Sequence, residues 1–178
     1  MAGRWLGGRS PIHRIVVALL VVALAASAYA WIECREENRR LVESIYYPLD
    51  SVLVLSGMAD FLEYSIGHGA ANACLRLQLI RFRDHAGFLS KVFSGLYGLT
   101  HEKKYDLLYT ATETLYDFLI DVSNDEPARM RARVKDSLGT LKSLQELFKE
   151  LSEYRRPEEI PESLARELFT ASQELSYK

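Results

Sequence analysis

The feature that most constrains this chain is an uncharged, apolar run near its start. Residues 15–32 read IVVALLVVALAASAYAWI and contain no charged side chain. A helix needs about 20 such residues to cross the hydrocarbon core of a bilayer, so this run is at the short end of a membrane span. We predict a transmembrane helix over residues 15–32. Its predicted membrane-anchoring residues are Ile15, Leu19, Leu20, Leu24, Trp31 and Ile32.

The charges around this run predict its direction through a membrane. Arg4, Arg9 and Arg14 precede it with no acidic residue among them, whereas residues 33–40 hold both signs of charge. Cytoplasmic flanks of membrane helices are enriched in positive charge. Residues 1–14 are therefore expected to be a basic region in the cytoplasm, with the rest of the chain outside it. Membrane lipid, contacted through the N-terminal helix, is the first predicted partner.

A cleaved signal peptide is the alternative interpretation of the same segment. The small residues of Ala28-Tyr29-Ala30, or of Ala26-Ser27-Ala28, suit cleavage, which would release a secreted body. The anchor is favoured because the apolar run continues through Trp31 and Ile32, and because the helical pattern continues into the segment that follows. Both interpretations place the body outside the cytoplasm.

After residue 33, apolar residues recur every three or four positions, which is the spacing of a helix with one buried face and of coiled-coil packing. The clearest stripe is Leu75, Leu79, Phe82, Ala86, Leu89, Phe93 and Leu96. No alternation typical of a strand stands out. Helices are predicted at about residues 33–66, 70–97, 101–123 and 127–153. Short connections make successive helices antiparallel, so we predict an all-α fold in which the N-terminal helix leads into an up-down-up-down four-helix bundle.

Turn-forming residues mark the expected helix ends. Gly67-His68-Gly69 suits a reversal, because glycine tolerates positive φ. Gly98 is expected to end one helix and Thr100 to cap the next. Pro48 is interpreted as a kink in the first long helix, although a proline can also separate two helices.

These breaks predict the domain organisation. The bundle is expected over residues 33–153. A linker at residues 154–160 follows, and a short C-terminal helix within residues 161–178 is expected to lie against the bundle. Cys34 and Cys74 fall too far apart in this arrangement for a disulfide and are interpreted as packing residues.

The charge balance argues against nucleic acid as a partner. The chain has 22 Lys and Arg residues against 24 Asp and Glu residues, a formal net charge of -2. The three arginines of residues 1–14 are part of that sum, so the body is more acidic still. Nonspecific nucleic-acid binding needs a basic surface that displaces counterions. No nucleic-acid binding is therefore expected.

Motifs for the common catalytic chemistries do not occur in the sequence. The Glu-x-x-His pairs of di-iron bundles, Cys-x-x-Cys, His-Glu-x-x-His, the phosphate-binding Gly-x-x-x-x-Gly-Lys and the nucleophile motif Gly-x-Ser-x-Gly are all missing. We therefore expect no metal, no other cofactor and no catalysis.

Five polar or aromatic residues are candidates for a ligand site or an interface. Tyr105, Tyr109 and Tyr116 lie on or beside one stripe of their helix, where they either line a cavity for a small ligand or pack at the edge of the core. His85 follows an aspartate that can orient it, but it also fits a polar helix face. Asn38 falls in the first apolar stripe, where a core asparagine can set helix register, or it faces solvent.

Two functions follow from these features. The favoured hypothesis is a single-pass membrane protein whose bundle is an interaction or structural module for a protein partner or a second copy. The alternative is a secreted or tethered bundle that binds a small ligand, which a cavity of about 300 Å³ or more between helices would favour. An enzyme would need His85 beside carboxylates or tyrosines in a cleft.

Overall fold

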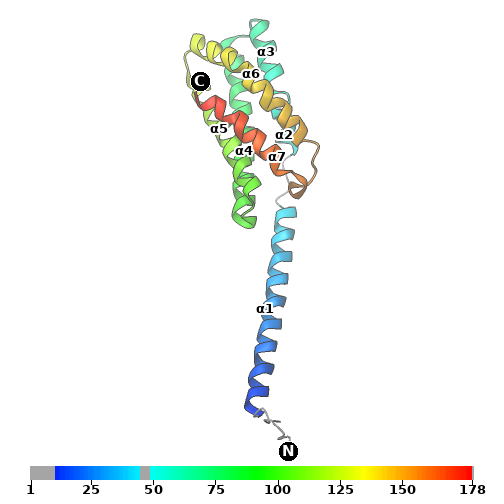
Figure 1. The fold of residues 1–178 in the computed structure, drawn as a ribbon. Coiled ribbons are helices and arrows are strands. Elements are labelled where there is room, and N and C mark those ends of the chain that lie inside the picture. Colours follow the sequence, from blue (N-terminus) through cyan, green and yellow to red (C-terminus); the bar gives the residue numbers. More distant parts are fainter. Residues whose placement is uncertain (1–10, 45–48, 178) are drawn as a thin grey trace, which may run out of the picture. The chain divides into compact units, whose positions relative to one another are not determined.

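The computed structural model describes residues 11–44 and 49–177, and it places side chains for residues 15–33, 35 and 49–175. All regular structure in these residues is helical (Figure 1), which confirms the all-α class. Contacts divide the chain into two compact units, Met1–Leu41 and Val42–Lys178. Several residues with sequence predictions lie outside the described backbone or side chains: Arg4, Arg9, Arg14, Cys34, Asn38 and Pro48.

The first unit consists of most of helix α1, Pro11–Ser44. Its segment Ile15–Glu33 is long and apolar enough to cross a membrane, it is the one such segment in the described residues, and none of it is buried. Each of the six predicted membrane-anchoring residues is at least 58% exposed: Ile15, Leu19, Leu20, Leu24, Trp31 and Ile32. An apolar helix with no covered face is typical of membrane spans and of signal sequences.

The continuous helix predicted to run to residue 66 is interrupted. Helix α2, Leu49–Leu55, ends before Ser56, and helix α3, Met58–Gly67, begins after Gly57. The Ser56 hydroxyl donates to a carbonyl of the last turn of α2 at 2.9 Å. The Gly57 carbonyl accepts the first amide bond of α3 at 3.2 Å. A serine that bonds the backbone and a glycine therefore separate α2 from α3.

Helices α4, Asn72–Thr100, and α5, Lys103–Asn124, are joined by a two-residue turn. The predicted end at Gly98 and the predicted cap at Thr100 are wrong, because α4 continues through Gly98 to Thr100 and is followed by His101, whose φ is 56°. The Thr100 hydroxyl donates to a carbonyl of α4 at 2.9 Å and accepts from the amide of Glu102 at 3.2 Å, and Glu102, not Thr100, is the N-cap residue of α5. A histidine thus takes the left-handed position that glycine usually fills.

The turn predicted at residues 67–69 is confirmed. Gly69 has a φ of 65°, and the amide of Ala70 bonds back to the carbonyl of Ser65 at 2.9 Å. This bond between the two ends of a six-residue segment is the Schellman pattern of helix ends. The remaining elements are α6, Pro127–Leu151, a 3-10 turn η1, Pro157–Glu159, helix α7, Glu162–Gln173, and a final 3-10 turn η2, Glu174–Tyr177.

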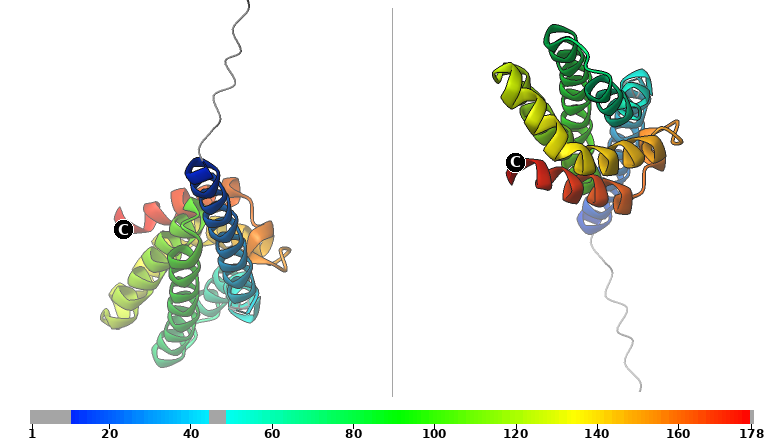
Figure 2. Two further views of the ribbon diagram at one scale, coloured as in Figure 1. Left: turned by 90° about the horizontal axis from the view of Figure 1, so that it is seen from below. Right: turned by 90° about the horizontal axis from the view of Figure 1, so that it is seen from above.

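The helices of the second unit form a closed series of neighbours. The α2–α3 pair packs on α4 and α6, α4 packs on α5, α5 on α7, and α7 on α6 (Figure 2). The four-helix arrangement is not confirmed, because α7 lies between α5 and α6 instead of outside a completed bundle. Its residues Leu164, Ala165 and Leu168 are buried in the common core.

The core is the apolar side of each helix in this series. All seven residues of the stripe predicted in α4 are at most 4% exposed: Leu75, Leu79, Phe82, Ala86, Leu89, Phe93 and Leu96. Burying a large apolar side chain stabilises a fold by about 1.5–3 kcal/mol. The spacing of three and four residues therefore predicts the buried face of α4 correctly.

Arginines hold together two loops at one end of the second unit. Arg76 of α4 donates to the backbone carbonyl of Asp125 at 2.7 Å, and Arg133 of α6 bonds the carboxylate of the same aspartate at 3.0 Å. Arg131 reaches the other loop, where it donates to the carbonyl of Ala70. The α3–α4 and α5–α6 loops are therefore both fixed by side chains of α4 and α6.

Candidate binding groove

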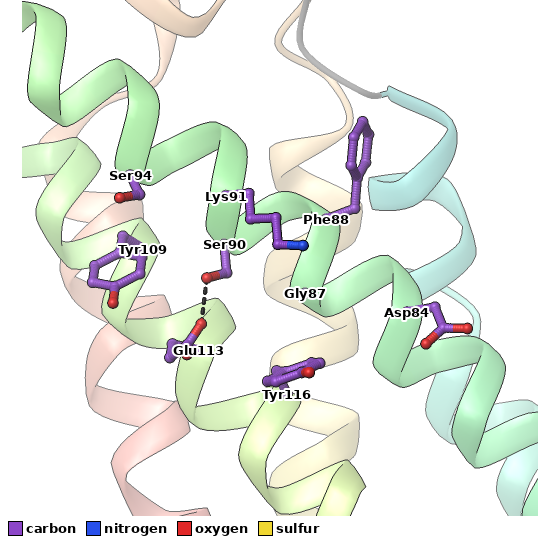
Figure 3. Close-up of a pocket in the computed structure, with 9 residues that line it drawn as sticks. All are labelled: Asp84, Gly87, Phe88, Ser90, Lys91, Ser94, Tyr109, Glu113 and Tyr116. Atoms are coloured by element: carbon purple, nitrogen blue, oxygen red, sulfur yellow. Dashed lines mark hydrogen bonds between the residues drawn. The ribbon is translucent and has the colours of Figure 1, made fainter.

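A groove of about 740 Å³ lies between α4 and α5 (Figure 3). We call it the α4–α5 groove. Its lining is Tyr109, Glu113 and Tyr116 from α5, with Asp84, Gly87, Phe88, Ser90, Lys91 and Ser94 from α4. Aromatic rings, one ammonium group, two carboxylates and two serine hydroxyls line it, which is the mixture of apolar surface and a few polar groups that small-molecule sites share.

Helix geometry brings these residues together. On α5 the lining positions 109, 113 and 116 are four and three residues apart, so they lie along one side of the helix. The two helices run antiparallel, as shown by the contacts of Ser90 with Glu113 and of Arg76 with Asp125. Position 87 of α4 therefore faces position 116 of α5, one helical turn from the contact of Ser90 with Glu113.

Gly87 lets an aromatic ring lie against the backbone of α4. A β-carbon at this position would come within 2.8 Å of two ring carbons of Tyr116. Carbon atoms in contact normally sit about 3.5–4.0 Å apart, so any other residue forces the ring to move. The position of Tyr116 in the groove therefore depends on the absence of a side chain at residue 87.

Glu113 is held in place by a hydrogen bond from the opposite helix. The hydroxyl of Ser90, a residue only 3% exposed, donates to the Glu113 carboxylate (Figure 3). Among the described residues, none forms a salt bridge with Glu113, and none forms one with the exposed Lys91 on the α4 side. The groove thus presents an oriented carboxylate and an ammonium group that are not paired with each other.

The α5 side of the groove has an acidic continuation. Burial raises the pKa of Asp117, and the nearby carboxylates of Glu113 and Asp121 raise it further. On the α4 side, the guanidinium of Arg83 lies 2.7 Å from the Asp84 carboxylate and compensates its charge. Three carboxylates, those of Glu113, Asp117 and Asp121, therefore lie near one another on α5, and Lys91 on α4 supplies positive charge at the groove.

The structure brings together two of the three predicted tyrosines. Tyr109 and Tyr116 line the groove, whereas Tyr105 is fully buried and belongs to the core. The Tyr105 hydroxyl has no hydrogen-bond partner among the described residues. Burial raises the pKa of this phenol, and the charges of Glu102 and Glu158 add to the rise. Tyr105 is therefore a packing residue, which is one of the two alternatives predicted for the tyrosines, and it does not line the groove.

His85 is also away from the groove, but it is not isolated. Its Nδ1 lies 2.9 Å from the hydroxyl oxygen of Ser51 in α2. Burial lowers the pKa of His85, and the charge of Arg81 lowers it further, while the carboxylates of Asp84 and Asp50 act in the opposite direction. Ser51 is only 4% exposed and lines no part of the groove. This hydrogen bond therefore joins α2 to α4.

Several lining residues are not among the candidates that the sequence suggested. In the sequence alone, Ser90 and Lys91 resemble ordinary surface residues of a helix, and Glu113 is one of many acidic residues. Gly87 carried a usable signal, because a glycine inside a helix costs about 1 kcal/mol relative to alanine and often has a packing reason. Cys74, interpreted as a packing residue, is exposed and free, so that interpretation is wrong.

No group of three potential metal ligands occurs among the described histidines, cysteines, aspartates and glutamates. No family model, no curated protein and no solved structure matches this chain. Its function therefore has to be argued from its own residues.

Proposed function

We propose that this chain is a single-pass membrane-anchored protein whose helical body lies outside the cytoplasm and works by binding, as an interaction or structural module, without catalysis. The observation that carries the proposal is the apolar segment Ile15–Glu33, none of which is buried, beside a body with its own core. Such a segment is stable in hydrocarbon and unfavourable in water.

The orientation rests on the flanking charges. Arg4, Arg9 and Arg14 support a cytoplasmic N-terminus, and with it a body on the other side of the membrane. A secreted body, released by cleavage near residue 30, is the alternative. The two differ only in whether the body remains attached to α1.

Cys74 offers a direct test of this topology, because it is exposed and free. We would replace Cys34 with serine and treat intact cells with a membrane-impermeant maleimide. The expected result is labelling of Cys74 from outside, in a protein that stays in the membrane pellet after an alkaline wash and begins at Met1. A matched variant with Gly8→Cys and without the other two cysteines should be labelled only after permeabilisation.

Two outcomes would overturn this topology. Labelling of Cys74 only after permeabilisation would place the body in the cytoplasm. A soluble product that begins near Trp31 would show a cleaved signal peptide and leave no anchor.

A protein partner or a second copy is proposed for the body because it exposes large apolar side chains. Those more than 40% exposed in the second unit are Leu53, Phe61, Tyr64, Leu77 and Phe88. Burying such side chains against a partner is favourable, because it removes apolar surface from water. Cross-linking in membranes followed by purification in a maltoside detergent should recover a complex, whereas consistent recovery of a monomer alone would count against this role.

Small-ligand binding is the second candidate function, and the α4–α5 groove favours it. Its volume of about 740 Å³ exceeds the roughly 300 Å³ at which ligand pockets begin. The groove opens between two helices and is separate from the packed core, so a ligand can enter it without unfolding the bundle.

A further inference from the structure

We propose that the α4–α5 groove binds a small zwitterionic molecule, with its ammonium group against Glu113 and its anionic group against Lys91. This inference rests on the second candidate function and names the chemical class of ligand. It is independent of the membrane topology, since every residue involved belongs to the second unit.

The ammonium end of the ligand is matched by the α5 side. The Glu113 carboxylate is oriented by Ser90, and Tyr109 and Tyr116 lie one helical turn away on either side of it (Figure 3). Tyrosine rings attract cations through their faces, by about 0.5–1 kcal/mol at exposed sites and more when water is excluded. A carboxylate between two such rings favours a positive group, and the acidic residues further along α5 strengthen that preference.

The anionic end is matched by Lys91. This lysine has no salt-bridge partner among the described residues, and its ammonium group has three donors on a flexible stem. Ser94 lies one turn further along the same side of α4 and offers a hydroxyl. A carboxylate or a phosphate beside Lys91 would therefore find both a charge and hydrogen-bond donors on that ammonium group, while the Ser94 hydroxyl lies on the Tyr109 side of the groove (Figure 3).

The charges of Glu113 and Lys91, which form no salt bridge with each other, favour one class of ligand over the others. A purely cationic ligand would be attracted by Glu113 but repelled by Lys91. A purely anionic ligand would be attracted by Lys91 but repelled by Glu113. A neutral ligand would cover both charges without pairing them, which costs free energy because a desolvated charge needs a partner. A zwitterion is the class that pairs both, and the exposed ring of Phe88 offers apolar contact at the edge.

Phosphorylcholine is a suitable probe, because it carries a quaternary ammonium group and a phosphate on one small skeleton. Choline and inorganic phosphate supply each charge alone. Binding would be measured by titration calorimetry on the full chain in a maltoside detergent, which has no charged headgroup. We expect phosphorylcholine to bind at least tenfold more tightly than either single-charge probe. Glu113→Gln and Lys91→Met should each weaken phosphorylcholine binding at least tenfold.

Matched controls remove charges outside the groove. Glu146→Gln and Lys135→Met alter exposed residues of α6 and should leave binding unchanged. Lys91 is exposed and unpaired, so Lys91→Met should fold normally and keeps the test valid even where Glu113→Gln lowers stability. Thermal unfolding of each variant would verify this.

Three results would overturn the proposal. The first is no binding of any probe, and the second is binding of choline as tight as that of phosphorylcholine and unaffected by Lys91→Met. The third is binding of phosphatidylcholine in nanodiscs without binding of free phosphorylcholine, which would assign the groove to a lipid headgroup. None of these results changes the labelling of Cys74, so failure here is distinguishable from failure of the membrane topology.

Discussion

Gly87 decides how two helices and one aromatic ring fit together. Replacing it with alanine should lower the free energy of unfolding by about 1 kcal/mol, because overpacking against Tyr116 costs about 1–3 kcal/mol and alanine returns about 1 kcal/mol of helix propensity. In a Tyr116→Ala background the same change should stabilise the protein by about 1 kcal/mol. Urea denaturation of the four variants would measure this double-mutant cycle.

Gly95 provides the control for that experiment. It lies in the same helix, and no atom comes within 4 Å of an added β-carbon. Gly95→Ala should therefore stabilise the protein by about 0.5–1 kcal/mol in both backgrounds. Equal effects of the alanine at positions 87 and 95 would show that the contact between residue 87 and Tyr116 is not present in solution.

Tyr105 gives a second prediction at the scale of one atom. Its buried hydroxyl has no partner among the described residues, and an unsatisfied buried polar group costs about 1–3 kcal/mol. Tyr105→Phe should therefore leave stability unchanged or raise it by up to about 1 kcal/mol, as measured by urea denaturation. Tyr97→Phe, at an exposed ring, serves as the neutral control. A loss of more than about 1 kcal/mol in Tyr105→Phe would reveal a bound water or another partner.

The sequence predicted poorly which individual residues come together in the groove. Tyr109 and Tyr116 were recognised as neighbours because helical spacing is readable in the chain. Ser90 and Lys91 come from another helix, and only the register of α4 against α5 brings them to Glu113. That register depends on side-chain packing between segments that are not adjacent in sequence, so no local pattern encodes it.

The attachment of α2 to α4 should respond to pH through His85. The folded protein lowers the pKa of this histidine below the value of 6.5 for an unperturbed residue, so the unfolded chain binds the proton more readily. His85 therefore contributes its full stability above about pH 6.5, and that contribution falls as the pH drops through the lowered pKa of the folded state.

Replacing the imidazole should remove this dependence. The loss of stability that His85 causes below pH 6.5 should be absent from the His85→Gln variant. The control variant His68→Gln, at an exposed residue, should show the same pH profile as the unmodified protein. Urea denaturation at several pH values between 4.5 and 8 would test this, and an unchanged pH profile in His85→Gln would contradict it.

The sequence predicted the buried faces of the helices better than the residues at which the helices end. The apolar stripe of α4 is buried throughout because three- and four-residue spacing is a property of the chain itself. The end predicted at Gly98 was placed too early, because the left-handed conformation that follows α4 occurs at His101, three positions later. The break at Ser56-Gly57 was missed because both residues also occur within helices, and only tertiary packing decides whether they end one.

At the scale of the whole molecule, α7 is the element whose role differs most from expectation. It packs on both α5 and α6. Leu168→Ala should therefore cost about 2–5 kcal/mol, whereas Glu167→Ala, on the exposed face, should change stability by less than about 0.5 kcal/mol. Truncation after residue 156 should abolish cooperative unfolding, measured by circular dichroism in urea. Cooperative unfolding of the truncated body would instead support the predicted four-helix bundle, in which α7 is not needed for the core.

The sequence predicted the apolar stripe of α7 but not the helices against which that stripe packs. Leu164 and Leu168 mark one face of a short helix, and such a face can cover any apolar surface within reach of its linker. The prediction of an outer position assumed that the four longer helices complete a core without it. The neighbours of α7 show that they do not.

The arginine contacts at Asp125 have a mechanical consequence for recognition. Arg76 joins α4 to the end of α5, Arg133 ties the same aspartate to α6, and the two-residue turn at His101 joins α4 and α5 at their other ends. Because the two helices that form its walls are joined at both ends, the α4–α5 groove should keep its width when empty, so an incoming molecule would spend little of its interaction energy on reshaping the walls. Affinity would then depend chiefly on the match of charges.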